Sequence, residues 1–366
     1  MMQILVAPNA FKGTIEADYA AQIIAEALQA KYPQATVVQC PIADGGDGTC
    51  SLLGKALRWQ PHTVRATDAR GRNKEATYYY NAATHTACTD ISSVSGIRHL
   101  SISERDVWSA STFGTGQLIV HAVQRGAQHI ILGLGGSASV DMGLGILQAL
   151  GLRLYDADNQ LIVPFSYRWL ERVAAFSAEN LQSVGKITCL CDVDNLFFGE
   201  QGAIPVFAPQ KGLQTVDKQA FTDNSVRIFG LLQQINPALM DKPSFGAAGG
   251  IPMGLSAFYQ VEIVSGATYF FEAVQMERLV AQSDWIITGE GRYDCQSESG
   301  KGCYALLLLA RKHGKRISLI SSGSPEELAV SGFDDVYALP SLDFSAADIT
   351  VQAVANMREV CLSIGK

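Results

Sequence analysis

The sequence lacks any hydrophobic run long enough to cross a membrane, and it lacks an excess of positive charge. No stretch of about 18 apolar residues occurs, so no membrane-spanning helix is expected. Lys and Arg number 28 against 35 Asp and Glu, which gives a net charge of −7. Because an acidic chain offers no general attraction to polyanions, we expect neither nucleic acid nor a membrane as a partner.

The eight cysteines lack the spacing of a zinc site or of a disulfide framework. No C-x-x-C pair occurs, and Cys189 and Cys191 lie on alternate faces of a strand-like run. Reduced thiols are typical of a cytosolic enzyme, so a cytoplasmic location is expected. The six histidines likewise lack metal-ligand or catalytic-triad spacing. The opening residues, MMQILVAPNAFKGT, lack the basic region of a secretory signal and are expected to form the first strand.

The length of 366 residues predicts two domains. Residues 1–64 follow a β-α-β pattern, which favours a parallel sheet, but they supply only two strands, too few for an independent sheet. The α/β pattern returns in residues 285–366. We therefore expect one α/β domain from these two segments, with residues 65–284 inserted as a second domain.

Hydrophobic periodicity predicts the main elements of both parts. Strands are expected at residues 3–7, 35–40, 84–91, 129–132, 152–155, 187–191, 284–288, 316–320 and 335–339, with a hairpin over 64–80. Helices are expected at residues 16–31, 117–124, 216–235, 269–280, 302–313 and 349–364. Residues 289–294 are expected to form a loop.

Residues 128–145, QHIILGLGGSASVDMGLG, contain a buried strand that ends in a loop with few side chains. Gly133, Gly135, Gly136 and Ser137 form this loop. Backbone N–H groups in such a loop can bind an anion, phosphate in particular. The alternative is a tight strand-to-helix turn in which glycine serves only for packing.

Four strand ends combine glycine with carboxylates. They are Asp44 with Asp47, Asp141, Asp192 with Asp194, and Glu290 with Asp294. One such loop means little, because turns commonly hold Gly and Asp. Four together favour phosphoryl transfer, since glycine lets a phosphate approach the backbone while carboxylates hold its magnesium. Lys12, Lys211 and Lys301 each lie next to a glycine, where an ammonium can neutralise phosphate oxygens.

Two other functions remain open at this point. Gly133 to Ala138 fits the pattern G-x-G-x-x-A after a strand, and Asp156 follows about 20 residues on, as in an NAD-dependent dehydrogenase. A non-catalytic sensor of a small anionic metabolite is the third hypothesis. A P-loop kinase is excluded, because no G-x-x-x-x-G-K-[ST] motif occurs.

The chain resembles the bacterial glycerate kinases of the type-1 family over nearly its whole length. Eight blocks in order carry the resemblance: APNAFKGT at 7–14, ADGGDGT at 43–49, STFGTG at 111–116, residues 133–145, CDVDN at 191–195, FAPQKG at 207–212, GAAGG at 246–250 and ITGEGRYD at 287–294. The resemblance implies ATP-dependent phosphorylation of D-glycerate to 2- or 3-phosphoglycerate with Mg²⁺. It also implies a flavodoxin-like domain with an inserted mixed α/β domain and a site in the cleft between them.

Residue roles follow as hypotheses. Catalytic roles are expected for Asp192, the preferred base, and for Asp141, Lys211 and Lys12; ATP binding for Gly133, Gly135, Gly136, Ser137, Gly45 and Gly46; substrate binding for Lys12, Arg292, Ser95 and Thr115; and Mg²⁺ binding for Asp44, Asp192, Asp194 and Glu290. Asn9 and Ala10 depart from the family pattern, which has an acid and a serine there. The oligomeric state stays open, a homo-oligomer included.

Overall fold

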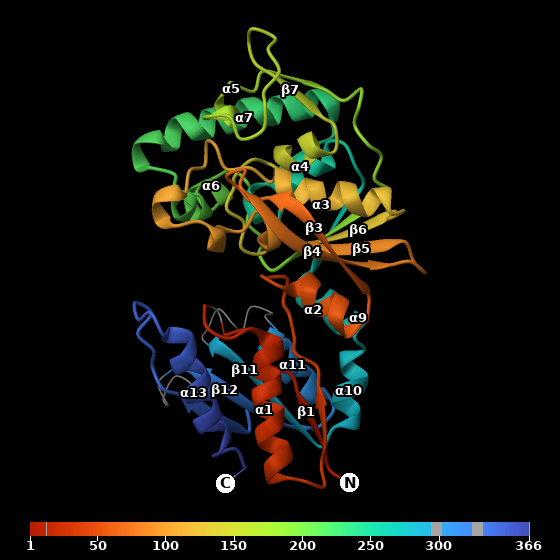
Figure 1. Ribbon diagram of the computed structural model, residues 1–366, viewed down its shortest axis with the longest axis vertical. Coiled ribbons are helices and arrows are strands. Elements are labelled where there is room, and N and C mark those ends of the chain that lie inside the picture. Colours follow the sequence, from red (N-terminus) through yellow and green to blue (C-terminus); the bar gives the residue numbers. More distant parts are fainter. Residues whose placement is uncertain (12, 294–301, 324–331, 366) are drawn as a thin grey trace. The chain divides into compact units, whose positions relative to one another are not determined.

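The computed structural model describes residues 1–11, 13–293, 302–323 and 332–365 (Figure 1). The contacts divide the chain into two compact units. Unit 1 comprises residues 1–44 and 267–366, and unit 2 comprises residues 45–266. The contact units therefore change at 44/45 and 266/267, whereas the sequence placed the domain boundaries at 64/65 and 284/285.

Unit 1 is built on a five-stranded parallel sheet with the order β13-β12-β11-β1-β2. Its strands are β1 (Gln3–Val6), β2 (Thr36–Gln39), β11 (Trp285–Arg292), β12 (Arg316–Ser322) and β13 (Asp335–Leu339). All four neighbouring pairs are parallel. Numbered by position along unit 1, the order is 2-1-3-4-5, which is the flavodoxin-like arrangement.

Helices cover both faces of this sheet. They are α1 (Ala17–Lys31), α10 (Met276–Gln282), α11 (Gly302–Lys312) and α13 (Ile349–Cys361). Helices α1 and α13 contact each other on one face, and α10 and α11 contact each other on the other face (Figure 1). Side chains alternate across a strand, so Ile4 and Val6 pack with α1 and α13 in one hydrophobic cluster.

Two details of unit 1 differ from the sequence prediction. Strand β11 continues through Arg292, where a loop was expected from Gly289, because its backbone keeps pairing with β12 across a register shift between Glu290 and Arg292. The single helix expected over residues 269–280 is divided into α9 (Gly266–Ala273) and α10. The division falls at Gln275, whose φ of 55° is not helical.

Unit 2 contains a six-stranded mixed sheet with the order β10-β9-β6-β5-β4-β3. Its strands are β3 (Gln60–Thr67), β4 (Asn73–Asn81), β5 (Thr86–Asp90), β6 (His129–Gly133), β9 (Lys186–Cys191) and β10 (Val261–Ser265). The predicted hairpin is confirmed as the antiparallel pair of β3 and β4. Strands β5, β6, β9 and β10 pair in parallel, so their carboxyl ends share one edge.

The remaining elements of unit 2 are shorter, apart from two long helices, and enclose a large hydrophobic core. They are α2 (Thr49–Ala56), α3 (Phe113–Gln124), α4 (Leu144–Ala149), α5 (Trp169–Arg172), α6 (Ala203–Phe207), α7 (Lys218–Ile235) and α8 (Ile251–Ser256), with a small sheet of β7 (Arg153–Tyr155) and β8 (Ala175–Ser177). The sequence did not predict α2, α5, α6, α8, β8 or β10.

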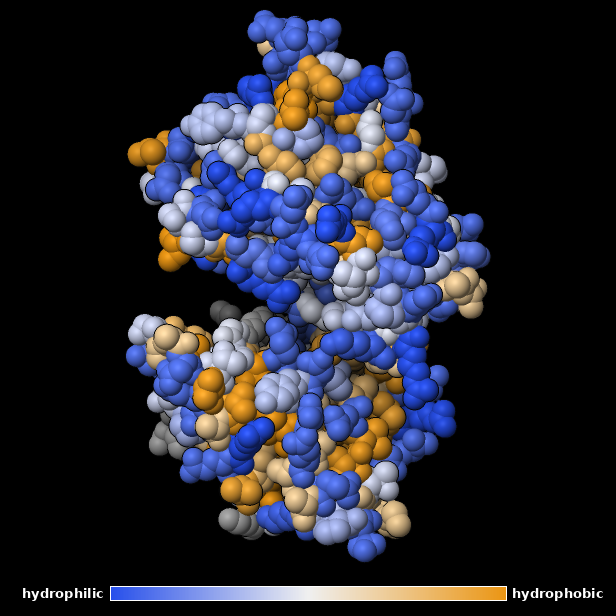
Figure 2. All heavy atoms as spheres, in the orientation of Figure 1, coloured by the Kyte–Doolittle hydropathy of each residue, from blue (hydrophilic) through white to orange (hydrophobic). Residues whose placement is uncertain are grey.

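The surface mixes hydrophilic and hydrophobic residues in both units (Figure 2). Exposed apolar side chains such as Ile102, Val216 and Met240 are scattered along the sequence, which is ordinary for a protein surface. Among the described residues, no helix has the length and apolar character needed to cross a membrane.

Candidate functional site

Strand order in unit 1 marks the place where a ligand is expected. The chain passes from β1 to β2 on one side and continues with β11 on the other side of β1, so the order reverses between β1 and β11. In open α/β sheets, ligands bind outside the carboxyl ends of the strands at such a switch point. Asn9 follows β1 and Glu290 lies near the end of β11. Asn9 and the acidic residue Glu290 therefore lie near the switch point at which a ligand is expected.

Asn9 and Asp44 form a buried polar pair at this edge. The Asn9 side-chain N–H donates to the Asp44 carboxylate over 2.9 Å, and the Asn9 side-chain oxygen accepts from the Ala10 N–H over 2.8 Å. The Asn9 backbone N–H donates to the Gly289 carbonyl, which fixes the loop against β11. The amide therefore holds one oxygen of Asp44 in a defined position.

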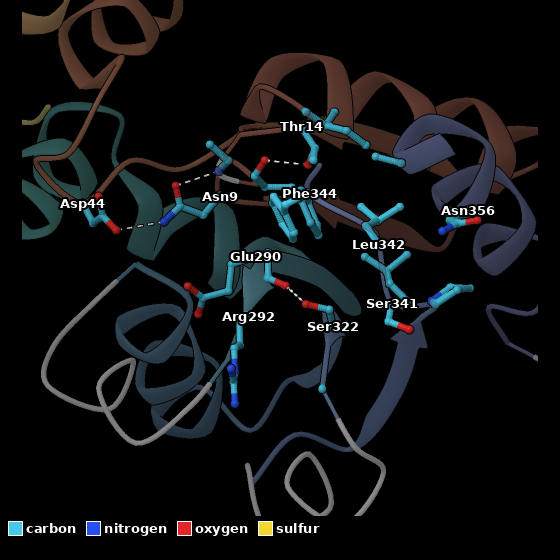
Figure 3. A pocket seen from close by; sticks show the side chains of 18 residues that line it. Asn9, Thr14, Asp44, Glu290, Arg292, Ser322, Ser341, Leu342, Phe344 and Asn356 are labelled. Atoms are coloured by element: carbon cyan, nitrogen blue, oxygen red, sulfur yellow. Dashed lines mark hydrogen bonds between the residues drawn. The ribbon is translucent and has the colours of Figure 1, made fainter. Parts of the chain in front are cut away.

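The pair lies at one end of a cavity of about 500 Å³ within unit 1 (Figure 3). Glu290 and Arg292 also line the cavity, Glu290 as a buried side chain and Arg292 as an exposed one. Segments beyond the acidic loops, which the sequence did not identify as part of a site, complete the lining. They include residues 339–342, Phe344, Ala353 and Asn356.

Lys12 lies outside the described residues, as do Asp294 and Lys301. The predicted catalytic and substrate-binding roles of Lys12 therefore stay predictions.

In unit 2 the two glycine loops lie directly against each other. A Cβ atom on Gly135 would lie 2.3 Å from the backbone carbon of Gly46, and one on Gly136 would lie 2.1 Å from a carboxylate oxygen of Asp47. Gly136 also has a φ of 64°, a backbone angle that residues other than glycine rarely adopt. Gly45 packs similarly on the backbone at Cys191 and Asp192. Close packing thus accounts for glycine at these positions, as one of the two interpretations predicted.

The same loop presents backbone donors. Hydrogen bonds fix the backbone on either side of these donors. The Leu134 N–H donates to the Leu190 carbonyl, and the Ala138 N–H donates to the Ser95 carbonyl. Between them, the N–H groups of Gly135, Gly136 and Ser137 donate to no other residue in the described part of the chain. Successive backbone N–H groups of this kind form an anion-binding concavity. Close packing and anion binding are therefore compatible here.

Lys211 supports this loop from the protein interior. Its ammonium donates to the Ser137 hydroxyl over 2.6 Å and to the Ser139 carbonyl over 2.9 Å, and its side chain is only 4% exposed. Burial lowers the pKa of Lys211 to about 7, while the charge of Asp141 acts in the opposite direction. The ammonium thus has described partners within the loop itself.

Asp141 is completely buried, and both of its carboxylate oxygens accept hydrogen bonds. Its two oxygens accept from the Thr112 N–H and hydroxyl at 2.8 Å each, and from the Ser139 hydroxyl and the N–H groups of Gly143 and Gly145 at 3.2 Å each. Burial raises the pKa of Asp141, and these donors counteract it. A carboxylate with this many internal donors is arranged to shape the loop. The contacts favour positioning over proton transfer for Asp141.

Ser95 and Thr115, predicted to bind substrate, are both 0% exposed. Their hydroxyls form a 2.9 Å hydrogen bond with each other. Because the Ser95 carbonyl accepts from Ala138, the pair is part of the support beneath the glycine loop. In this structure neither hydroxyl reaches solvent.

Asp192 and Asp194 follow β9 and are both exposed. They belong to unit 2, whereas the other two predicted metal ligands, Asp44 and Glu290, belong to unit 1. Within residues 1–11, 13–293, 302–323 and 332–365, no group of three or more His, Cys, Asp or Glu side chains could hold a metal ion by itself.

Asp90 is a carboxylate that the sequence did not single out. It ends β5, next to Gly133 in the parallel pair, and accepts from the N–H groups of Cys50 and Ser51 at the start of α2. Burial raises its pKa to about 7. The sequence did show an acid near the end of a predicted strand. It did not predict α2, the helix whose first N–H groups bond to Asp90.

The comparison with known proteins agrees with the geometry. The model of the glycerate kinase family matches residues 4–366. The glycerate kinase of Halalkalibacterium halodurans is 30% identical over 345 residues, which cover 93% of this chain and 91% of that protein. The glycerate 2-kinase of Escherichia coli is 31% identical, with 92% and 90% covered.

A solved structure from Salmonella typhimurium LT2, provisionally named glycerate kinase 2, matches with a TM-score of 0.82 and 30% identity over 99% of this chain and 97% of that one. The predicted α/β fold is thereby confirmed. These relatives and the glycerate kinase of Bacillus subtilis support neither the dehydrogenase nor the sensor hypothesis. The chain belongs to the glycerate kinase family.

Proposed function

We propose that this protein is a glycerate kinase that uses ATP and Mg²⁺ to phosphorylate D-glycerate, giving 2- or 3-phosphoglycerate. The observation that carries the proposal is the row of three backbone N–H groups at Gly135, Gly136 and Ser137 in a chain of this family. Phosphoryl transfer requires little covalent chemistry from the protein, because positioning and charge stabilisation supply most of the rate enhancement.

The glycine loop of residues 133–137 binds phosphate oxygens of ATP through these backbone donors, with the loop at Gly45 and Gly46 packed beside it. Such donors need no reorganisation during the reaction, since the loop is fixed by its own hydrogen bonds. Lys211 contributes by holding Ser137, and Asp141 by holding the following turn. Both act as positioning residues.

Magnesium fits the carboxylates present. Mg²⁺ is commonly held by one or two carboxylates together with substrate phosphates, so a complete protein cage is not required. Asp44 and Glu290 in unit 1, with Asp192 and Asp194 in unit 2, are the proposed ligands. When bound, the ion neutralises charge on the phosphate oxygens.

The acceptor requires a cation for its carboxylate and a base for its hydroxyl. Arg292, an exposed guanidinium at the end of β11, pairs with the glycerate carboxylate, and Lys12 is the second proposed partner. A guanidinium offers two parallel donors that match a carboxylate. Asp192, exposed at the end of β9, accepts the hydroxyl proton.

The test is incubation of the purified protein with ATP, Mg²⁺ and D-glycerate, with the product read by phosphorus NMR. The expected result is ATP-dependent formation of one phosphoglycerate, and the chemical shift and proton coupling identify the phosphorylated oxygen. Omission of Mg²⁺ or replacement of D-glycerate by L-glycerate serves as a control. Absence of turnover would overturn the proposal, and reduction of NAD by glycerate would favour a dehydrogenase.

A further inference from the structure

We propose that the apolar half of the unit 1 cavity binds the nucleoside of ATP and that Asn356 selects adenine as its base. The inference rests on the proposed kinase function. Its starting point is size, because the cavity measures about 500 Å³, within the range that accommodates drug-sized ligands. Glycerate has only seven non-hydrogen atoms. The acceptor alone therefore leaves most of the cavity unfilled.

The lining of the cavity divides into a polar half and an apolar half. In Figure 3, Asn9, Asp44 and Glu290 lie toward one end, and Leu342 and Asn356 lie toward the other. The apolar lining side chains come from the segment after β1, the end of β13, the segment between β13 and α13, and α13 itself: Phe11, Ile15, Leu339, Leu342, Phe344 and Ala353. A complex of ATP with Mg²⁺ has the same division, since its base is flat and weakly polar while its metal ion is the one that Asp44 and Glu290 are proposed to hold.

Asn356 supplies a specific polar contact in the apolar half. It lies on α13, is half-buried, lines the cavity, and forms no hydrogen bond with any other residue in the described part of the chain. A side-chain amide offers one donor direction and one acceptor, the pattern that pairs with the N6 amino group and a ring nitrogen of adenine. Guanine presents two acceptors at the corresponding edge, so the amide oxygen would be left facing an acceptor.

Aromatic walls suit a flat base. Phe11 is buried beneath the cavity, and Phe344 is 71% exposed although it lines the same cavity. An aromatic ring this exposed loses little packing when it is removed, yet it provides a face for stacking. Stacking on an aromatic side chain hardly distinguishes one base from another, because every base has a flat face. The preference for adenine is therefore assigned to Asn356.

The first test measures binding of ADP and GDP by isothermal titration calorimetry to the parent, to Asn356→Leu and to the control Arg358→Leu, an exposed position on the same helix. The parent is expected to prefer ADP. Asn356→Leu is expected to weaken ADP binding by about 5- to 150-fold, the range of one good bidentate contact, and to remove most of the preference over GDP. Arg358→Leu is expected to bind like the parent.

The second test uses kinetics of the same variants together with Phe344→Ala, for which the exposed Tyr167→Ala is the matched aromatic control. Asn356→Leu and Phe344→Ala are expected to raise the KM for ATP about fivefold or more, with the KM for D-glycerate within twofold of the parent. Tyr167→Ala is expected to leave both KM values unchanged. Matching thermal unfolding midpoints verify that the variants fold.

Failure of the inference and failure of the proposed function give different results. If the parent does not phosphorylate D-glycerate, the kinase proposal fails, whereas ADP binding still reports on the cavity. If the parent is active but Asn356→Leu binds ADP as the parent does, the nucleoside assignment is overturned. A raised KM for D-glycerate with an unchanged KM for ATP would also overturn it, because the apolar half would then belong to the acceptor.

Discussion

The two units use charged side chains in opposite ways. In unit 2, Asp141 and Lys211 are 0% and 4% exposed and their described partners are groups of the protein itself. In unit 1, Asp44, Glu290 and Arg292 line a cavity large enough for a ligand. Asp141 and Lys211 are therefore enclosed by the protein, whereas Asp44, Glu290 and Arg292 face a space that a ligand can occupy.

The difference teaches that a glycine loop can bind a ligand while the charged side chains near it only support its backbone. A buried charge must be paired and hydrogen-bonded, or its desolvation destabilises the fold. Asp141 meets this requirement with five donors, so the charge shapes the backbone. The backbone N–H groups of Gly135 to Ser137 then remain available for the proposed phosphate binding.

Asp192 differs from Asp141 in being an exposed carboxylate of unit 2. Asp192→Asn is expected to lower kcat by about 10²- to 10⁴-fold, because an amide cannot accept the hydroxyl proton. Steady-state kinetics measure the loss, and urea unfolding should show unchanged stability. Glu200→Gln, another exposed acid of unit 2, is the control. If kcat stays within a few-fold of the parent, Asp192 is not the base.

Asp141 should show the opposite behaviour. Asp141→Asn replaces one carboxylate oxygen by an amide nitrogen, whose N–H then faces either the Thr112 and Gly145 donors or the Ser139 and Gly143 donors, so buried donors face each other. Loss of one partner in such a buried network costs about 3–5 kcal/mol in the free energy of unfolding. Urea denaturation measures it, with the exposed Asp158→Asn as the control. Parent-like stability with a large loss of kcat would instead restore Asp141 as a candidate base.

Substitutions of Asn9 test whether the Asp44 carboxylate of unit 1 binds Mg²⁺. Asn9→Ala removes the N–H that holds the Asp44 carboxylate over 2.9 Å. Loss of a group that orients a metal ligand typically weakens metal affinity by 10- to 100-fold, so the Mg²⁺ concentration for half-maximal activity should rise by about this factor. Asn9→Asp is the informative partner, because it adds a carboxylate beside Asp44 and should lower the Mg²⁺ requirement. An unchanged Mg²⁺ dependence in both variants would remove Asp44 from the metal site.

Much of the fold follows from local sequence patterns. The β1-α1-β2 unit was predicted from hydrophobic periodicity, and the β3-β4 hairpin from alternation around a turn, because both patterns lie in adjacent residues. The extension of β11 through Arg292 was not predicted, since glycine-rich sequence is typical of a loop and only pairing with β12 makes it a strand. Short elements such as β8 and β10 carry too few residues to show a period.

The candidate site was predicted less completely than the fold. Glycines and carboxylates at strand ends identified the loops, yet the sequence could not tell the buried Asp141 from the exposed Asp192, because both follow predicted strands in similar loops. Ser95 and Thr115 were predicted to bind substrate, and that stays a prediction; the sequence did not show that their buried hydroxyls bond to each other. Asn356 gave no signal, because its place in the cavity depends on how α13 packs on the sheet.

Lys211 gives the sharpest contrast between the units. Its pKa is about 7 in the folded protein against an ordinary value of 10.5, so between these pH values the unfolded chain binds more protons than the folded one. The free energy of unfolding should therefore rise with pH across this window, by at most about 1.4 kcal/mol per pH unit, and the contribution should be lost as pH falls toward 7. Lys211→Met removes the titrating group, so the parent-minus-variant difference in stability should follow this slope in urea titrations. The exposed Lys218→Met, in the same unit, should show no such slope. A flat difference for Lys211→Met would mean that the ammonium pays no desolvation cost, and the contrast between a structural charge in unit 2 and ligand-facing charges in unit 1 would lose its energetic basis.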